Sequence, residues 1–229
     1  MKLCIALDLP SKEGNLALLN SLNNSDQIWL KVGLRSFIRD GAEFLKEIKA
    51  LNPQFKIFLD LKLYDIPNTM GDSVESIAML NVDMLTIHAS SGKEAMLEVM
   101  KRLKTFPNPP LVMAVTALTS FDKESFFEIY HTGLETQVLE FAKMAKECGV
   151  NGVVCSCAES LVIKTQCGDE FLTLTPAIRP FGESSADQKR VATLQDAKEA
   201  KSDFIVVGRP IYKAENPKKV VEAILENLK

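Results

Sequence analysis

The sequence predicts an α/β fold, a (β/α)8 TIM barrel that holds the whole chain in a single domain. Short apolar runs rich in β-branched residues recur along the 229 residues, and stretches with helical spacing separate them. Strict alternation of strands and helices is typical of a parallel sheet. Because eight such repeats fit into a chain of this length, a closed barrel is favoured over an open doubly wound sheet.

The predicted strands are eight short apolar segments. In chain order they are Leu3–Leu7, Ile28–Val32, Lys56–Asp60, Met84–His88, Leu111–Thr116, Gly152–Cys155, Phe171–Thr175 and Phe204–Val207. Between them, apolar residues follow helical spacing most clearly over Leu34–Ile48 and Pro217–Leu225. No Pro/Gly/Ser-rich spacer, run of like charge or low-complexity tract interrupts the chain, so we expect residues 1–229 to form one domain.

Composition and charge argue against several classes of protein. The net charge of −3 and the pI near 5.6 are not those of a nucleic-acid-binding surface, which would show a basic stripe. The chain has no uncharged apolar run of about 18 residues, and Asp8 interrupts the first apolar run too early for a signal peptide. We therefore expect a cytoplasmic protein without membrane contact. The five cysteines are odd in number and have no secretory context, so we expect free thiols.

Three charged residues crowd the end of the third predicted strand. Asp60 and Lys62 are two positions apart, so on an extended strand both side chains project to the same face, and Asp65 follows in the turn before Pro67. Two carboxylates beside an amine favour its charged form, which equips Lys62 to donate a proton to a strongly basic centre. The alternative is a surface ion pair at the strand end that has no catalytic role and contributes little to stability.

Polar residues also follow most of the other predicted strands, at the end where barrels carry their chemistry. Two arginines come after strands seven and eight, where barrels often hold a phosphate, so we expect a dianionic ligand there; Gly208 would let a backbone amide approach it closely. Each residue alone could be a solvated arginine, a helix cap or a strand end, but together they fall on one rim. They are Asp8, Lys31, Asp60, Lys62, Thr116, Thr119, Arg179, Gly208 and Arg209.

With these residues in place, the chain resembles the orotidine 5'-phosphate decarboxylase family over almost its whole length. The resemblance implies decarboxylation of orotidine 5'-monophosphate to uridine 5'-monophosphate, the last step of de novo pyrimidine synthesis, without metal or organic cofactor. The segments that carry it are Asp60-x-Lys62-x-x-Asp65-Ile66-Pro67-x-Thr69, Leu7-Asp8, Lys31-Val32-Gly33, Val115 to Ser120, Gly152 to Ser156, Thr175 to Pro180, Asp187 to Arg190, and Val207 to Ile211.

The resemblance also implies catalytic roles. Lys62 would stabilise the carbanion left by departing carbon dioxide and then protonate it, with Asp60 close to the departing carboxylate. Asp65 and Thr69 would cross from the neighbouring subunit, so the resemblance implies a homodimer with shared active sites.

The remaining implied roles are in substrate binding. Asp8 and Lys31 would bind the ribose hydroxyls, together with Thr69 of the neighbouring subunit. Thr119 would contact the pyrimidine, with Ser120 as the alternative if the register differs by one.

At the other end of the substrate, Gln188 would link base and phosphate. Arg179, Gly208 and Arg209 would grip the phosphate, and binding of this remote group could drive closure of the Pro180 to Ala186 loop.

Two positions depart from the family pattern. Ala177 stands where Thr-Pro-Gly-Ile-Arg has glycine, and Cys157 stands where alanine is commoner. If position 177 needs a positive φ, we expect alanine to stiffen the approach to the phosphate loop.

Other interpretations remain open. A sugar-phosphate decarboxylase or aldolase with the same Asp-x-Lys-x-x-Asp core would need magnesium, whereas a silent nucleotide-binding barrel would not need Lys62 between carboxylates. Cys155-x-Cys157 could suggest zinc, but His88 and His131 are the only histidines and no second cysteine pair has ligand spacing. We therefore expect no metal site.

Overall fold

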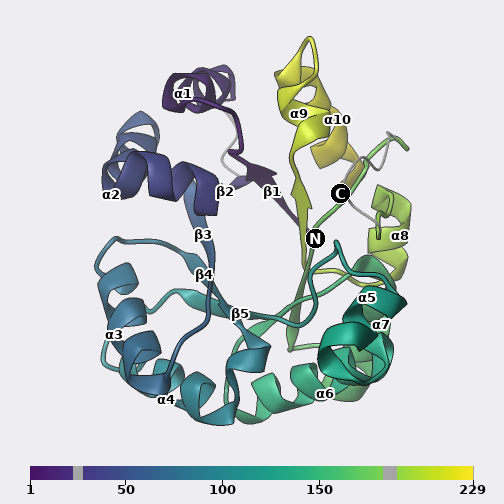
Figure 1. Ribbon diagram of the computed structural model, residues 1–229. Coiled ribbons are helices and arrows are strands. Elements are labelled where there is room, and N and C mark those ends of the chain that lie inside the picture. The colour runs from purple at the N-terminus through teal and green to yellow at the C-terminus, as the bar shows by residue number, and fades with distance from the viewer. Residues whose placement is uncertain (23–27, 183–189, 229) are drawn as a thin grey trace.

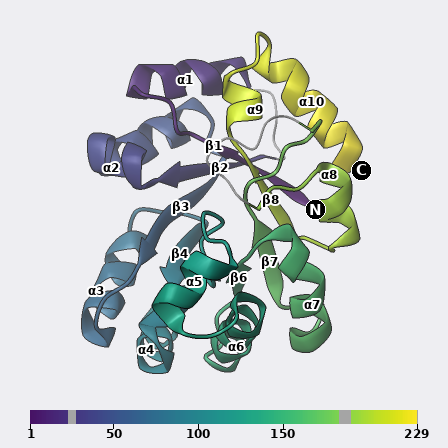
Figure 2. The same cartoon turned by 45° about the vertical axis from the view of Figure 1, so that its right-hand side comes forward.

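A computed structural model, which describes residues 1–22, 28–182 and 190–228, shows parallel strands closed into a barrel in the order β1 to β8. Figure 1 shows the helices in a ring outside the strands, and the turned view in Figure 2 shows the same arrangement. The strands are β1 (Lys2–Ala6), β2 (Ile28–Gly33), β3 (Lys56–Leu63), β4 (Met84–His88), β5 (Leu111–Val115), β6 (Gly152–Val154), β7 (Leu172–Thr175) and β8 (Phe204–Val207).

Each strand is followed by one or two helices, as the alternating sequence pattern predicts. They are α1 (Lys12–Ser21), α2 (Leu34–Leu51), α3 (Pro67–Ala78), the short 3-10 helix η1 (Ala89–Ser91), α4 (Lys93–Leu103), α5 (Lys123–Tyr130), α6 (Leu134–Glu147), α7 (Cys157–Cys167), α8 (Leu194–Glu199), α9 (Arg209–Tyr212) and α10 (Pro217–Leu228). Side-chain caps fix several starts: the Ser11 hydroxyl accepts from Gly14 N at α1, and Asp122 accepts from Ser125 N at α5.

The predicted barrel is therefore confirmed, and the predicted strands agree closely with the observed ones. The largest difference is at β3, which was expected to end at Asp60 and instead continues to Leu63. The barrel closes through β1 and β8, where Lys2 pairs with Phe204 and Ile5 with Val207.

Alternate residues along each strand face two different cores. In β1, Leu3 and Ile5 pack with the helices in the larger core, whereas Cys4 and Ala6 belong to a smaller core inside the barrel. The ring of Trp29 meets that of Phe204 edge to face in this inner core, with centroids 5.2 Å apart. This packing fills the interior of the barrel below the rim.

Within the part of the chain that the structure describes, no helix is long and apolar enough to cross a membrane. All five cysteines are free, as expected, and all are buried.

Candidate active site

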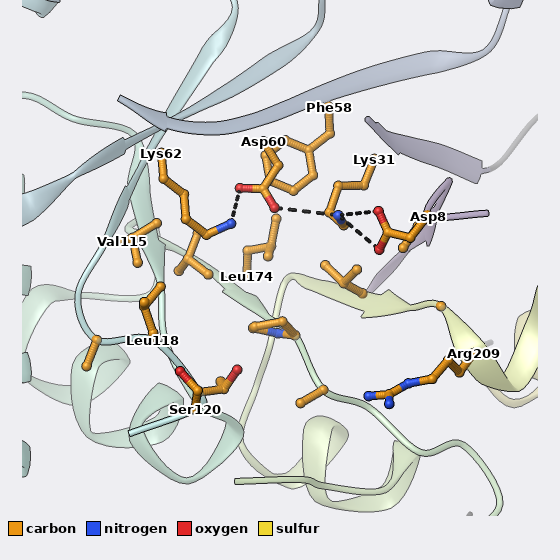
Figure 3. A pocket seen from close by; sticks show the side chains of 18 of the residues that line it. Asp8, Lys31, Phe58, Asp60, Lys62, Val115, Leu118, Ser120, Leu174 and Arg209 are labelled. Carbon is orange, nitrogen blue, oxygen red and sulfur yellow. Dashed lines mark hydrogen bonds and ion pairs between the residues drawn. The ribbon is translucent and has the colours of Figure 1, made fainter. Parts of the chain in front are cut away.

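A cavity of about 330 Å³ opens at the carboxyl ends of the barrel strands. Figure 3 shows Asp8, Lys31, Asp60 and Lys62 on one side of it, with Arg209 apart from them and Leu118 and Ser120 near a third edge. Of the predicted site residues, those that line the cavity are Asp8, Lys31, Asp60, Lys62, Thr119, Arg179, Gly208 and Arg209, and the alternative Ser120 lines it as well. The structure therefore brings together predicted residues from the ends of β1, β2, β3, β5, β7 and β8.

The charged residues of β1, β2 and β3 form a chain of alternating sign across the cavity wall (Figure 3). Lys62 Nζ lies 2.8 Å from Asp60 Oδ1, and Lys31 Nζ lies 3.6 Å from Asp60 Oδ2. Lys31 Nζ also lies 3.4 Å from Asp8 Oδ1. Asp60 thus contacts two ammonium groups, which fixes the direction of its carboxylate.

Burial makes these charges interact strongly. Asp60 is only 8% exposed. Burial acts to raise the pKa of Asp60, but the charges of Lys31 and Lys62 and the hydrogen bonds from Lys62 and Thr86 lower it below its usual value. Burial likewise acts to lower the pKa of Lys31, and the carboxylates of Asp60 and Asp8 raise it instead. Asp60 is therefore an anion and Lys31 a cation at neutral pH.

The main chain at Lys62 differs from the extended strand that the two-residue spacing suggested. Its φ is 52°, in the left-handed region, and the pairing of β3 with β4 shifts register between Leu59 and Leu63. The side chains of Asp60 and Lys62 still meet, but through an irregularity of the strand and not through its regular alternation.

The loop after β5 contributes Thr119 and Ser120 to the cavity. Thr116, which was also expected at the rim, is fully buried, and its hydroxyl donates to the carbonyl of Val154 at 3.0 Å. It belongs to the barrel wall and not to the cavity. Arg190 braces the same loop, because its Nη2 donates to the carbonyls of Ala117 and Leu118 at 3.3 and 3.0 Å.

Two arginines line the cavity at the ends of β7 and β8. Arg179 is 6% exposed, and its backbone N donates to Ala192 O at 2.8 Å. Gly208 has little space around it: an added Cβ would lie 3.3 Å from Ala6 Cβ. The two arginines and the backbone amide of Gly208 can together hold an anionic group.

Ala177 has a φ of 64°, so the position does require the left-handed conformation that the family's glycine adopts readily. An L residue there carries strain, and this strain lies two positions before Arg179.

Besides Thr116, two predicted residues that the structure describes, Asp65 and Thr69, are not brought to the cavity. Asp65 and Thr69 are exposed and lie outside the residues that line it, and Asp65 Oδ1 accepts from the amide of Ile66 at 2.7 Å. Gln188 lies outside the described residues, as do positions 183–186 of the predicted mobile loop.

Sequence reasoning did not identify the apolar wall of the cavity. Inward-facing side chains of the strands build it, and their alternation along each strand is the signal that could have found them. They include Phe58, Val115, Val154, Leu174 and Val206, with Leu118 and Tyr212 from the following segments.

The five cysteines and the two histidines are not among the residues that line the cavity. Burial raises the pKa of Cys157 to about 11, and His88 shares a hydrogen bond of 2.6 Å with the hydroxyl of Ser90 through Nδ1. Over residues 1–22, 28–182 and 190–228, no three His, Cys, Asp or Glu side chains are grouped to hold a metal ion.

The arrangement combines an ammonium held against a buried carboxylate, an apolar wall and a pair of arginines. A fixed cation in such a site stabilises negative charge that develops on a substrate, and an ammonium can then supply a proton. The two arginines could bind an anionic group elsewhere on the same substrate.

Comparisons with known proteins agree with this chemistry. A sequence model of the Orotidine 5'-phosphate decarboxylase / HUMPS family matches residues 1–224. The chain is 65% identical over 228 residues to orotidine 5'-phosphate decarboxylase of a Nitratiruptor species, with all of both chains covered. It is 61% identical to that of Wolinella succinogenes, again over the full length of both. The solved orotidine 5'-phosphate decarboxylase of Lactobacillus acidophilus is 35% identical, with a TM-score of 0.87, covering 100% of this chain and 99% of that one.

Proposed function

The chain belongs to the orotidine 5'-phosphate decarboxylase / HUMPS family, and we infer that the cavity at its barrel mouth is where it converts orotidine 5'-monophosphate to uridine 5'-monophosphate. This reaction is the last step of de novo pyrimidine biosynthesis. The relatives described above are named for it, which favours it over magnesium-dependent sugar-phosphate chemistry. The observation that carries the assignment is Lys62 Nζ held 2.8 Å from buried Asp60 at the cavity wall.

Lys62 is proposed as the group that meets the reacting carbon. When the bond from C6 to the carboxylate breaks, carbon dioxide leaves and the electron pair stays on C6, in the plane of the ring. That pair cannot delocalise into the ring carbonyls, so a nearby fixed positive charge must stabilise it. A proton then moves from Nζ to C6, which leaves a neutral amine that takes a proton from water.

Asp60 is proposed to act on the same carboxylate. Its lowered pKa keeps it ionised, and its contacts with Lys31 and Lys62 prevent it from turning away. An anion in this position opposes the substrate carboxylate but not the neutral carbon dioxide that forms from it, so its repulsion is relieved as the reaction proceeds.

The rest of the substrate would be held along the cavity. Asp8 and Lys31 would bind the ribose hydroxyls, and Thr119 or Ser120 would contact the pyrimidine against the apolar wall. Interactions remote from the reacting carbon help to offset the free energy needed to place it against Lys62.

Arg179, Arg209 and the Gly208 amide would bind the phosphate, supported by their common position at the ends of β7 and β8. Gln188 remains a proposed link between base and phosphate.

We further propose a homodimer with shared active sites, in which Asp65 and Thr69 of one subunit complete the cavity of the other. Two observations support this. Both residues are exposed on the segment that follows β3, and the apolar side chains that flank Asp65 are exposed as well, Tyr64 by 65% and Ile66 by 66%. Exposed apolar side chains around a functional carboxylate fit a surface that pairs with a second copy.

The proposal includes a cytoplasmic location and no need for a metal or organic cofactor. Five free, buried thiols fit a reducing compartment. The test is turnover of orotidine 5'-monophosphate in excess EDTA, followed by the ultraviolet absorbance of the orotate ring. Conversion to uridine 5'-monophosphate is expected, and an unchanged spectrum would contradict the assignment. Activity that appears only with added magnesium would instead favour the sugar-phosphate chemistry.

A further inference from the structure

We propose that Thr86 is a positioning residue, whose buried hydroxyl bridges the main chain of Lys62 and the carboxylate of Asp60 and so holds the ammonium in place. This inference rests on the proposed function, because it assigns the residue that sets the geometry of its two charged groups. Thr86 lies on β4 and is not among the residues that line the cavity.

The irregularity in β3 creates the need for such a residue. Leu59 pairs with Leu85 and Leu63 pairs with Ile87, so three residues of β3 face the single residue Thr86 on β4. The extra residues interrupt the regular ladder of backbone hydrogen bonds. The side chain of Thr86 supplies one of the missing acceptors, because its Oγ1 accepts from the backbone N of Lys62 at 2.9 Å.

The same hydroxyl also fixes the carboxylate. An amide N–H can only donate, so the hydroxyl proton of Thr86 remains available and is donated to Asp60 Oδ1 at 3.0 Å. That oxygen is the one that accepts from Lys62 Nζ at 2.8 Å. The three groups therefore form a closed ring of hydrogen bonds, which begins at the backbone of Lys62 and returns to its side chain.

Strain and burial make the hydroxyl necessary. Lys62 has a φ of 52°, a conformation that a non-glycine residue keeps only when its surroundings hold it. Thr86 is fully buried, so water cannot replace the lost hydroxyl. Without it, the Lys62 amide loses its partner and the backbone is expected to relax, which moves Nζ away from the reacting carbon. A misplacement of about 1 Å can cost on the order of 100-fold in rate.

The test compares Thr86→Val, which removes the hydroxyl at nearly constant volume, with Thr86→Ser, which keeps it. Thr173→Val is the matched control: Thr173 is also fully buried on a barrel strand, but its hydroxyl bonds to Ser160 on α7 at 2.8 Å. We expect Thr86→Val to lower kcat by roughly 10- to 100-fold. Its affinity for uridine 5'-monophosphate should change by less than about threefold, because the phosphate and ribose contacts remain. Thr86→Ser and Thr173→Val should keep kcat within about threefold of the unaltered chain.

A kcat of Thr86→Val equal to that of Thr173→Val would overturn the inference, as would an equal loss in Thr86→Ser. If Thr86→Val does not fold, amide hydrogen exchange in the unaltered chain decides: slow exchange at Lys62 supports the bridge, and exchange as fast as at exposed Tyr64 overturns it. The unaltered chain also separates the two proposals. If it does not turn over the substrate, the proposed function fails, whereas turnover with no effect of Thr86→Val removes only the role of Thr86.

Discussion

Lys62 and Asp60 form an ion pair of 2.8 Å across a strand irregularity, with the lysine main chain in a left-handed conformation and the aspartate side chain buried. The pair is tied to a second ammonium, because Lys31 Nζ lies 3.6 Å from the other oxygen of Asp60. Asp60 therefore lies between two ammonium groups, and its negative charge offsets their mutual repulsion. The consequences can be tested one group at a time.

Replacing Asp60 by Asn keeps the shape of the side chain and removes its charge. We expect kcat to fall by roughly 10²- to 10³-fold, because Lys62 loses the anion that orients it. Asp83→Asn is the matched control, since Asp83 also pairs with two lysines, Lys49 at 3.2 Å and Lys56 at 2.8 Å, away from the cavity. Steady-state kinetics of both variants would contradict the role of Asp60 if the two lost activity equally.

The protein should become less stable as the pH falls, and protonation of His88 should account for part of this loss. Burial and the charge of Lys62 lower the pKa of this histidine. Its folded pKa therefore lies below the unfolded value of about 6.5, so below that pH the unfolded state binds a proton that the folded state does not. Its contribution is present above the unfolded pKa and is lost as pH falls.

Urea unfolding between about pH 8 and pH 5 measures this effect. The unaltered chain should lose stability more steeply than His88→Gln, in which the titrating group is absent. Parallel curves for the two proteins would contradict the lowered pKa of His88.

Ala177→Gly should stabilise the protein. A left-handed L residue costs roughly 1–2 kcal/mol, whereas glycine adds about 0.4–1 kcal/mol of unfolded-state entropy, so a net gain of up to about 1.6 kcal/mol in the free energy of unfolding is expected. Ala223→Gly, within α10, should instead destabilise by about 1 kcal/mol. Denaturant unfolding distinguishes the two, and a loss of equal size at both positions would show that Ala177 is not strained.

Mixing two variants tests the proposal that the subunits of a dimer share their active sites. A dimer formed from an Asp65→Asn chain and a Lys62→Ala chain contains one site with both original residues, so a random mixture should recover about a quarter of the unaltered activity. Asp60→Asn mixed with Lys62→Ala is the control, because those two residues serve the same site from one chain. Recovery no greater than in the control would argue against a contribution of Asp65 across the interface.

Much of the fold and the charged rim could be predicted from the sequence, because both depend on local patterns. Alternating apolar runs predicted the barrel, and the polar residues after the strands predicted which side chains line its cavity. Thr116 and Thr86 show where this reasoning stops. Both are threonines on or beside a strand, and only the pairing of neighbouring strands shows that one bonds to Val154 and the other to Asp60.

The conformation of Lys62 could not be predicted for a similar reason. Regular alternation predicts that Asp60 and Lys62 share a face, and nothing in the run around them signals extra residues relative to β4. The register shift is a property of two strands together. Whether position 177 needs a positive φ also depends on the folded backbone. Its φ is positive, as the glycine found in the family at this position suggested.

The central claim is that Lys62 stabilises and protonates the carbon that loses carbon dioxide, and turnover by Lys62→Ala tests it most directly. The control is Lys56→Ala, which removes an ammonium paired with Asp83 away from the cavity. We expect Lys62→Ala to lose roughly 10⁴-fold or more in kcat while still binding uridine 5'-monophosphate, and Lys56→Ala to keep its activity. A Lys62→Ala chain that retained more than about a tenth of the unaltered kcat would contradict the account.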